Sequence, residues 1–478
     1  MLKIKTALLA AIAVSVSLAF AAPVLADTIF QAMEKAYVNN PDLNAARAGL
    51  RATDEGVAIA KAGWRPQISG FAQKTTQQYN LGDGISKLTN TDQTTGETTV
   101  LDNHFDYHGF NTGTVGLTIT QQVFDGFQTL NNVRAAEANV YSERASLKAT
   151  EIQTLLAAAQ AYADIARDQE FVDIRKQNMA FLNEQVRAAK SRLDVGEGTK
   201  TDVSLSQSQL AQAQALLADA ISQLKQSKAV YVQIVGETPK GIKQAQPISR
   251  QVPGTIDKAV ATGWREHPQI LATMYAVDSA GFKVKSAEGQ MLPGVVVQGQ
   301  IANNQGTSDL TSLNNYSVSS LTARLNVPIY QGGAEYGQIR EAKEKLGQQQ
   351  ILLDSVRLEV QKTIVSGMAQ YEAAEASISA NLVQLKAANE ALAGVIEERK
   401  VGQATTLDVL DAQTRVLNAK ESLAASRRDA VVSSFAIVAA MGHLTIETQD
   451  LKVARYDPEV HYKAVKDKWF GLRTVDGR

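Results

Sequence analysis

The feature of this sequence that most constrains its fold is an internal duplication. The motif Val-Gly-x-x-Thr occurs at Val195–Thr199 and again at Val401–Thr405, 206 positions later (401 − 195). The same offset relates Gly236 to Gly442. A constant offset along the chain indicates two tandem copies of one structural unit. We therefore expect a first repeat over residues 27–253, a second over 254–449, and a tail over 450–478.

Each copy opens with a helical pattern that a proline divides. Pro41 and Pro268 stand 227 positions apart (268 − 41). The residue before a proline disfavours helical geometry, so one helix should end and another begin at each of these prolines. Pro66 and Pro293, again 227 apart (293 − 66), should end the second helix of each copy.

Strand-like sequence follows within residues 66–124 and 293–330. Apolar residues alternate with small polar ones at Val115, Leu117 and Ile119, and again at Leu321, Ala323 and Leu325. This period of two predicts strands with one apolar and one polar face. Strands of about ten residues are long enough to cross a bilayer at a tilt. A half-exposed hairpin in solution is the alternative.

The offset falls from 227 to 206 across these strands, so the first copy carries 21 additional residues (227 − 206). They lie near 80–107 and are rich in Gly, Thr, Asn and Asp, which predicts a long polar surface loop. His104 and His108 stand here with Asp102 and Asp106. Their spacing leaves a metal site as an alternative, but we expect a solvated loop and no metal.

A long helix should follow the strands in each copy. Residues 127–195 contain neither Gly nor Pro. At about 1.5 Å per residue, such a helix extends roughly 100 Å. A rod of this length suits an element that spans the periplasm better than it suits a globular core.

The returning helix of each hairpin carries a seven-residue repeat. One row is apolar, and the row three residues later is mostly small: Val203, Leu210, Leu217, Leu224, Tyr231 with Ser206, Ala213, Ala220, Ser227, Ile234; then Val409, Val416, Leu423, Ala430, Ile437 with Ala412, Ala419, Ser426, Ser433, Ala440. A strict heptad imposes a left-handed supercoil, and small residues allow close approach. The pattern fits either a closed ring of helices or a simple two-helix coiled coil.

The N-terminal sequence predicts secretion. Lys3 and Lys5 precede an apolar run over 7–22, and Ala26 follows small residues at a cleavage position. We expect a signal peptide over residues 1–26, with an N-terminal anchor as the alternative. The net charge of −1 argues against a nucleic-acid partner. Without Cys, P-loop or nucleophile motifs, we expect no enzyme, catalytic residue or cofactor.

Together these features resemble the TolC family of outer-membrane efflux and secretion channels, in its non-lipidated branch. The most specific segments are Val401–Ala412 and Pro328–Gly333. The resemblance implies a mainly α fold with a transmembrane β part, in a homotrimer that shares a twelve-stranded β-barrel and a long coiled-coil α-helical barrel. It also implies residence in the outer membrane of a Gram-negative cell. A periplasmic coiled-coil adaptor or structural protein is the alternative function.

The resemblance further implies functional positions at the hairpin tips. The acidic ring of the pore constriction matches Asp408 and Asp411, which face one way at i and i+3. The family's gate residues, Tyr and Arg, are here Arg399 and Ala404, and their partners match Thr201 and Asp202. We therefore expect an Arg399–Asp202 ion pair as a substitute latch.

The resemblance also implies partners. A periplasmic adaptor protein is expected to dock at the two tips, at Val195, Gly196, Val401 and Gly402. An inner-membrane transporter of the RND or ABC class would complete the assembly, which would export drugs, other small molecules or proteins. Outer-membrane lipid would surround the strands.

Overall fold

A computed structural model describes residues 27–79, 87–91, 94–102, 108–307 and 315–477. The predicted signal peptide lies outside the described residues, as does His104 of the alternative metal site.

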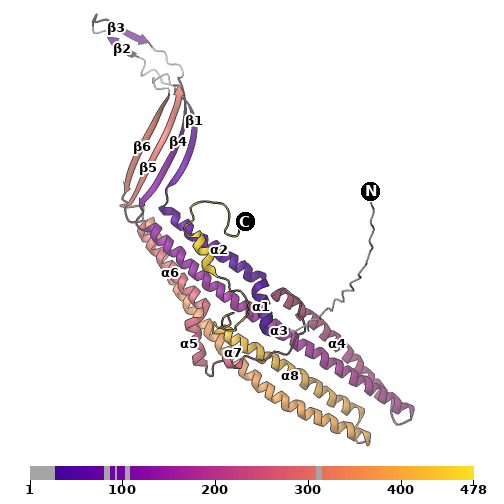
Figure 1. Cartoon of the computed structure of the whole chain (residues 1–478). Helices are drawn as coiled ribbons and strands as arrows, with labels where there is room; N and C mark the ends of the chain where they lie inside the picture. Colours follow the sequence, from indigo (N-terminus) through magenta and orange to yellow (C-terminus); the bar gives the residue numbers. More distant parts are fainter. Residues whose placement is uncertain (1–26, 80–86, 92–93, 103–107, 308–314, 478) are drawn as a thin grey trace, which may run out of the picture. The chain divides into compact units, whose positions relative to one another are not determined.

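The order of two helices, two long strands and two helices occurs twice in the described chain, and the first set carries β2 and β3 in addition (Figure 1). The first set is α1 (Ile29–Asn39), α2 (Pro41–Lys61), a 3-10 turn (Ala62–Trp64), β1 (Gln67–Tyr79), β2 (Lys87–Thr91), β3 (Thr98–Asp102), β4 (His108–Phe124), α3 (Gln128–Asp194) and α4 (Lys200–Val235). The second set is a 3-10 turn (Ser249–Gln251), α5 (Ile256–Glu266), α6 (Pro268–Gly289), β5 (Gly294–Thr307), β6 (Asn315–Asn326), α7 (Ala334–Lys400) and α8 (Thr406–Ala440), with α9 (Pro458–Val465) after it. The repeat boundaries at 253 and 449 remain a prediction.

The prolines divide the helices as expected. Pro41 is the first residue of α2, and Pro268 is the first residue of α6. A proline is favourable there because its missing N–H would have no partner in the first turn. His267 caps α6, since its Nδ1 accepts a hydrogen bond from the backbone N–H of Gln269 at 3.1 Å.

Four strands form one antiparallel sheet in the order β1-β4-β5-β6, while β2 and β3 pair separately. The register places Leu117 opposite both Gly70 and Ile301, and Leu321 opposite Gly299. Partners in an antiparallel ladder share a face, so Ile68, Leu117, Ile119, Ile301 and Leu321, from all four strands, lie on one side. Leu321 is 80% exposed on that side. The predicted alternation is therefore confirmed, and β1 and β6 are the two edges.

The chain forms two compact units. One contains residues 27–41, 151–256 and 364–453, and the other contains 42–150, 257–363 and 454–477. The first unit holds the hairpin tips, and the second holds the sheet and the C-terminal tail. No helix in the described chain is long and apolar enough to cross a membrane.

The heptad residues of α8 are buried. All ten positions expected in its two rows have little exposure, and Ala419 and Ile437 have none. In α4 the small row is buried at Ser206, Ala213, Ala220 and Ser227, but only Leu224 and Tyr231 are buried in the larger row. The other three residues of that row, Val203, Leu210 and Leu217, are half-buried, so one flank of α4 is partly open in a single chain.

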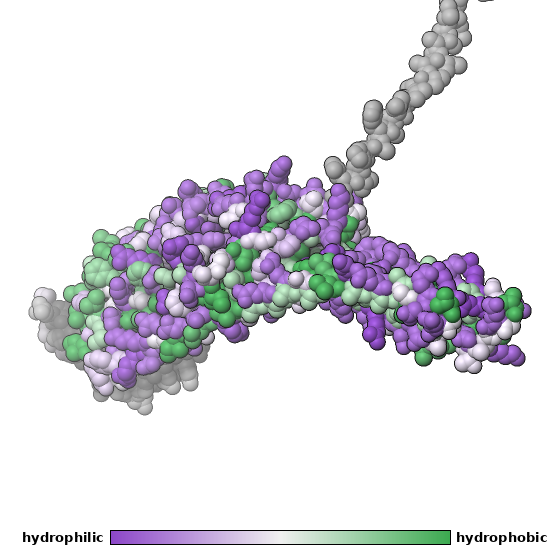
Figure 2. Space-filling model, turned by 90° about the horizontal axis from the view of Figure 1, so that it is seen from below, coloured by the Kyte–Doolittle hydropathy of each residue, from purple (hydrophilic) through white to green (hydrophobic). Residues whose placement is uncertain are grey.

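The helical surface is mostly polar, with apolar residues in small separate patches (Figure 2). On α7, Ile351 is 72% exposed and Leu358 is 65% exposed. These two residues are seven positions apart, so they lie on one stripe of the helix. That stripe is available to another helix.

Gly126, at the turn from β4 into α3, offers a test of the packing within the second unit. Its φ is +68°, and a Cβ there would lie 2.2 Å from the carbonyl oxygen of Gly289. We expect Gly126→Ala to lower the free energy of unfolding by about 1–3 kcal/mol. Gly337→Ala in α7 is the control, because nothing lies within 4 Å of its Cβ position. The control should be neutral or slightly stabilising, and denaturant unfolding in detergent measures both. Equal effects would contradict the close approach.

Candidate functional site

The two hairpin tips have the same backbone construction. α3 and α7 end in a Schellman motif, with Gly196 at φ 80° and Gly402 at φ 78°. The N–H groups of Glu197 and Gln403 each donate a hydrogen bond to the carbonyl oxygen five residues earlier, at 2.8 Å and 2.9 Å. The left-handed position favours glycine because a Cβ would be strained there. This explains the Val-Gly part of the repeated motif.

The Thr of the motif caps the returning helix. Thr405 accepts a hydrogen bond from the N–H of Asp408 at 3.2 Å, and the Asp408 carboxylate accepts from the Thr405 N–H at 2.7 Å. Thr199 and Asp202 form the same reciprocal capping box on α4. Reciprocal capping satisfies two backbone donors that the helix leaves unpaired. The motif therefore closes a tight turn and starts a helix within about ten residues.

Asp408 and Asp411 point to the exposed side of α8, as their spacing predicts. Both are exposed, as is Arg415. Hydrogen bonds from Thr405 hold the pKa of Asp408 below its usual range. Arg415, four residues after Asp411 on the same helix face, was not predicted. The i, i+4 spacing in the sequence would have been sufficient to find it.

Arg399 lies at the end of α7 and is 8% exposed. Its guanidinium donates a hydrogen bond to Oε1 of Gln185 on α3 at 2.6 Å, and its Nε is buried without a partner. Burial lowers the pKa of Arg399, and the nearby Arg192 lowers it further, while Asp202 raises it. A buried cation with incomplete hydrogen bonding is costly, so it favours a nearby anion.

Asp202 stands at the start of α4 and connects the two tips. Hydrogen bonds from Thr199 and Thr406 lower its pKa, and the charge of Arg399 acts in the same direction. Within this single chain, no ion pair joins Arg399 directly to Asp202 among the described residues. Thr201 is exposed. The Arg399–Asp202 latch remains a prediction, and Gln185 and Thr406 are contacts that the sequence did not indicate.

Side chains between the hairpins hold the tips together. Leu182 of α3, Ala213 of α4 and Leu410 of α8 form a small buried apolar cluster. Beside it, Gln413 donates a hydrogen bond to Asn178 at 2.9 Å. Burial of this cluster positions α8, and therefore Asp408 and Asp411 on its other side.

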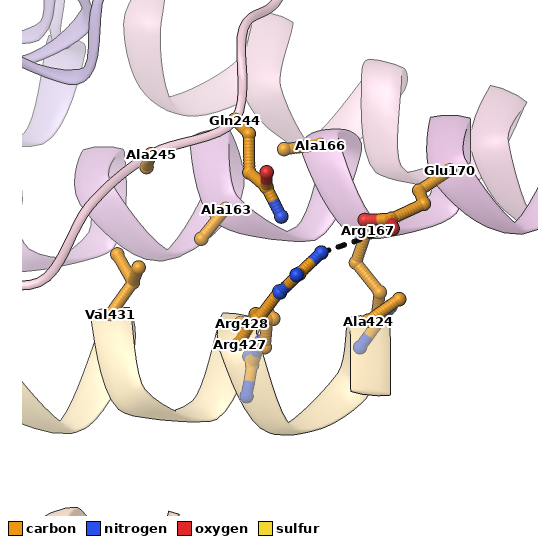
Figure 3. Close-up of a pocket in the computed structure, with 10 residues that line it drawn as sticks. All are labelled: Ala163, Ala166, Arg167, Glu170, Gln244, Ala245, Ala424, Arg427, Arg428 and Val431. Carbon is orange, nitrogen blue, oxygen red and sulfur yellow. Dashed lines mark ion pairs between the residues drawn. The ribbon is translucent and has the colours of Figure 1, made fainter. Parts of the chain in front are cut away.

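Ion pairs join α3 to α8 further from the tips. Arg175 pairs with Glu421 at 2.7 Å and Arg428 with Asp164 at 2.8 Å. Figure 3 shows Arg427 reaching from α8 to Glu170 on α3, an ion pair at 3.7 Å, across a pocket also lined by Gln244. Burial raises the pKa of Glu170, which the charge of Arg427 opposes. These pairs fix one hairpin against the other.

Comparisons with known proteins identify the family. The model of the family described as outer membrane efflux protein matches residues 32–237 and 264–443. The chain belongs to the outer membrane efflux protein family. Outer membrane efflux protein BepC of Brucella suis is 44% identical over 454 residues, covering 95% of this chain and 94% of that protein. Outer membrane protein TolC of Escherichia coli is 23% identical, covering 89% and 84%.

A solved structure shows the same fold as this efflux protein. The CmeC outer membrane channel of Campylobacter jejuni matches with a TM-score of 0.74 at 13% identity, covering 93% of this chain and 90% of that chain. The resemblance and fold class drawn from the sequence are thus confirmed. The protein is an outer-membrane exit duct. The family match decides against the alternative of a periplasmic adaptor.

The capping box can be tested in this efflux protein. Thr405→Ala should remove about 1 kcal/mol of local stability, so amides 406–409 should exchange roughly fivefold faster. Gln403→Ala, an exposed tip residue outside the cap, is the control. Hydrogen exchange with mass spectrometry measures both variants. Unchanged protection in Thr405→Ala would show that the cap does not hold the helix start.

The same caps predict a pH dependence. The folded-state pKa values of Asp202 and Asp408 lie below the ordinary 3.8. Their contribution to stability is therefore present above the unfolded pKa and is lost as the pH falls through the folded values. Exchange at both tips, corrected for the intrinsic rate, should rise below about pH 4 and be constant from pH 5 to 7. A rise above pH 5 would contradict this assignment.

Proposed function

We propose that three copies of this chain form one continuous duct through the outer membrane and the periplasm. The observation that carries the proposal is the open four-stranded sheet, whose apolar face covers all strands. Within the part of the chain that the structure describes, its edge strands, β1 and β6, carry backbone groups with no partner strand. Unpaired backbone groups cannot lie in lipid, so each edge must pair with another copy. Three sheets of four strands would close a twelve-stranded barrel.

The length of the helices supports a duct that spans the periplasm. α3 and α7 each contain 67 residues. At 1.5 Å per residue each is about 100 Å long. The partly open flank of α4 and the exposed stripe of α7 would then pack against helices of neighbouring copies, which form the helical barrel.

A passive duct needs partners that supply energy and cargo. The exposed apolar tips, Val195 at 72% and Val401 at 71% exposure, support docking of a periplasmic adaptor there together with Gly196 and Gly402. An inner-membrane transporter of the RND or ABC class would drive export. The 44% identity to a protein named for efflux favours small molecules as cargo. Export of a secreted protein through the same duct is the second candidate function.

The proposed constriction lies at the tips. Three copies would bring six carboxylates of Asp408 and Asp411 into a narrow lumen, with three Arg415 side chains one turn further along. A ring of carboxylates favours cations, and a neighbouring ring of arginines opposes that preference. The constriction should therefore select cations, but less strongly than the acidic pair alone would.

Variants of these residues test the constriction. Asp408→Asn with Asp411→Asn should lower the ratio of cation to anion permeability several-fold in planar bilayers. Arg415→Gln should raise it. Asp278→Asn, an exposed carboxylate on α6, is the control and should leave the ratio unchanged. If all variant trimers conduct normally and have the same ratio of cation to anion permeability, the constriction does not lie at these residues.

The proposed gate is the cluster around Arg399. Its buried guanidinium, the amide of Gln185 and the charge of Asp202 hold the ends of α7, α3 and α4 together. Asp202 is only half-buried, so its pairing with Arg399 would contribute only about 0–1 kcal/mol, but three symmetric copies would act together. Opening would separate the tips when an adaptor docks.

Removal of the latch should open the entrance. Arg399→Ala should increase single-channel conductance in planar bilayers, since the tips lose the contact with Gln185 and the attraction of Asp202. Arg187→Ala is the matched control, because Arg187 lies near the same tip but its side chain is 72% exposed and pairs with Glu184 on its own helix. Unchanged conductance in Arg399→Ala would reject the latch.

A further inference from the structure

The C-terminal tail, residues 454–477, is held against α2 and α3 within its unit. His461 of α9 lies 2.9 Å from the carboxylate of Asp54, and both residues are buried. Arg144 of α3 pairs with Glu459 and lies over the ring of Tyr462 at 4.9 Å. These contacts hold the tail in one place on this unit, so the surface that its exposed residues present has a defined position.

Beyond α9 the tail runs along α2 toward the strands. Asp467 pairs with Lys61 near the end of α2 at 2.6 Å, and the carbonyl of Lys468 accepts from Arg65 at 2.8 Å. Further on, Asp476 returns to Arg51 at 3.4 Å. The loop between these contacts passes beside Arg65, two residues before β1 begins.

The apex of this loop, residues 468–473, has an apolar surface. Lys468 donates through its Nζ to the carbonyl of Arg473 at 2.7 Å, which closes the loop around Gly471 at φ +117°. Phe470 is 90% exposed and Leu472 is fully exposed. Trp469 is 65% exposed and lies under the guanidinium of Arg65 at 4.9 Å. We call Trp469, Phe470 and Leu472 the apical patch.

The charges around the apical patch are cationic. Both acidic residues of the loop, Asp467 and Asp476, are already paired with cations of α2. Lys466 lies over the ring of Tyr462 at 5.6 Å, and the guanidinium of Arg473 has no partner in the described chain. The loop thus presents an aromatic and aliphatic surface with positive charge beside it.

Exposed apolar residues also stand beside Arg65 in the chain, where the sheet begins. Trp64 is 47% exposed next to Arg65, and Ile68, one residue into β1, is 68% exposed. Aromatic side chains with adjacent cations are the composition of membrane interfaces, where rings enter the headgroup region and cations meet phosphate.

We propose that the apical patch inserts into the phospholipid leaflet at the periplasmic face of the outer membrane, with Lys466 and Arg473 against headgroup phosphates. The proposal rests on the sheet crossing that membrane, as the proposed function requires. It gives the tail a role as an interfacial anchor that fixes the depth and orientation of the duct.

Spin labels can test this directly, because the chain contains no cysteine. A nitroxide on Phe470→Cys in trimers reconstituted into phosphatidylethanolamine/phosphatidylglycerol vesicles should be more accessible to oxygen than to a water-soluble nickel chelate. The matched control is Val460→Cys, which is 63% exposed and stands in the first turn of α9, nine residues before Trp469 (469 − 460). Its label should show the opposite preference.

Two results would overturn the proposal. Equal, aqueous accessibility of both labels would place the patch in water, and a Phe470 label shielded from both reagents would place it against protein. Channel conductance of the same labelled trimers separates this failure from a failure of the proposed duct. In addition, Phe470→Ser with Leu472→Ser, which removes no internal contact, should lower the yield of membrane-inserted trimer several-fold without changing its stability in detergent.

Discussion

The need to satisfy backbone hydrogen bonds at the two edges of the sheet determines how this protein can exist. β1 and β6 each have one paired side, and the face they share with β4 and β5 is apolar. Such a sheet is stable in lipid only when other strands complete its edges. The strands can therefore fold in the membrane only when copies of the chain assemble. The helices of those copies are then arranged with the same symmetry as the strands.

The helices satisfy their own backbone groups, so their constraint is different. α3 and α7 each continue for 67 residues, and the returning helices α4 and α8 carry one apolar heptad row beside one row of mostly small residues. Small residues such as Ala213 and Ala419 lie where two helices approach closely. The ion pairs of Arg175 and Arg428 fix the register of α3 against α8, since each pair can form in only one alignment of the two helices.

Much of this architecture was predictable from local rules. Prolines 41 and 268 mark helix boundaries because the ring excludes helical geometry before it, and the alternation around Leu117 predicts a one-sided strand. The rule for heptads predicted the burial of α8 but not the partly open flank of α4, because a pattern does not tell which neighbour belongs to another copy. The contact of Arg399 with Gln185 joins residues 214 positions apart, a separation that no local pattern encodes.

Asp408 caps a helix and at the same time presents an exposed carboxylate, so its structural role does not exclude the proposed role in the pore. One of its oxygens accepts both hydrogen bonds from Thr405, while the residue remains exposed. Hydrogen bonding lowers its pKa, so the cap keeps the carboxylate charged over a wider pH range. Asp202 occupies the same position in the first tip, where hydrogen bonds from Thr199 and Thr406 lower its pKa and the charge of Arg399 adds to that effect. The duplicated motif therefore fixes two identical turns, while the residues around each turn differ.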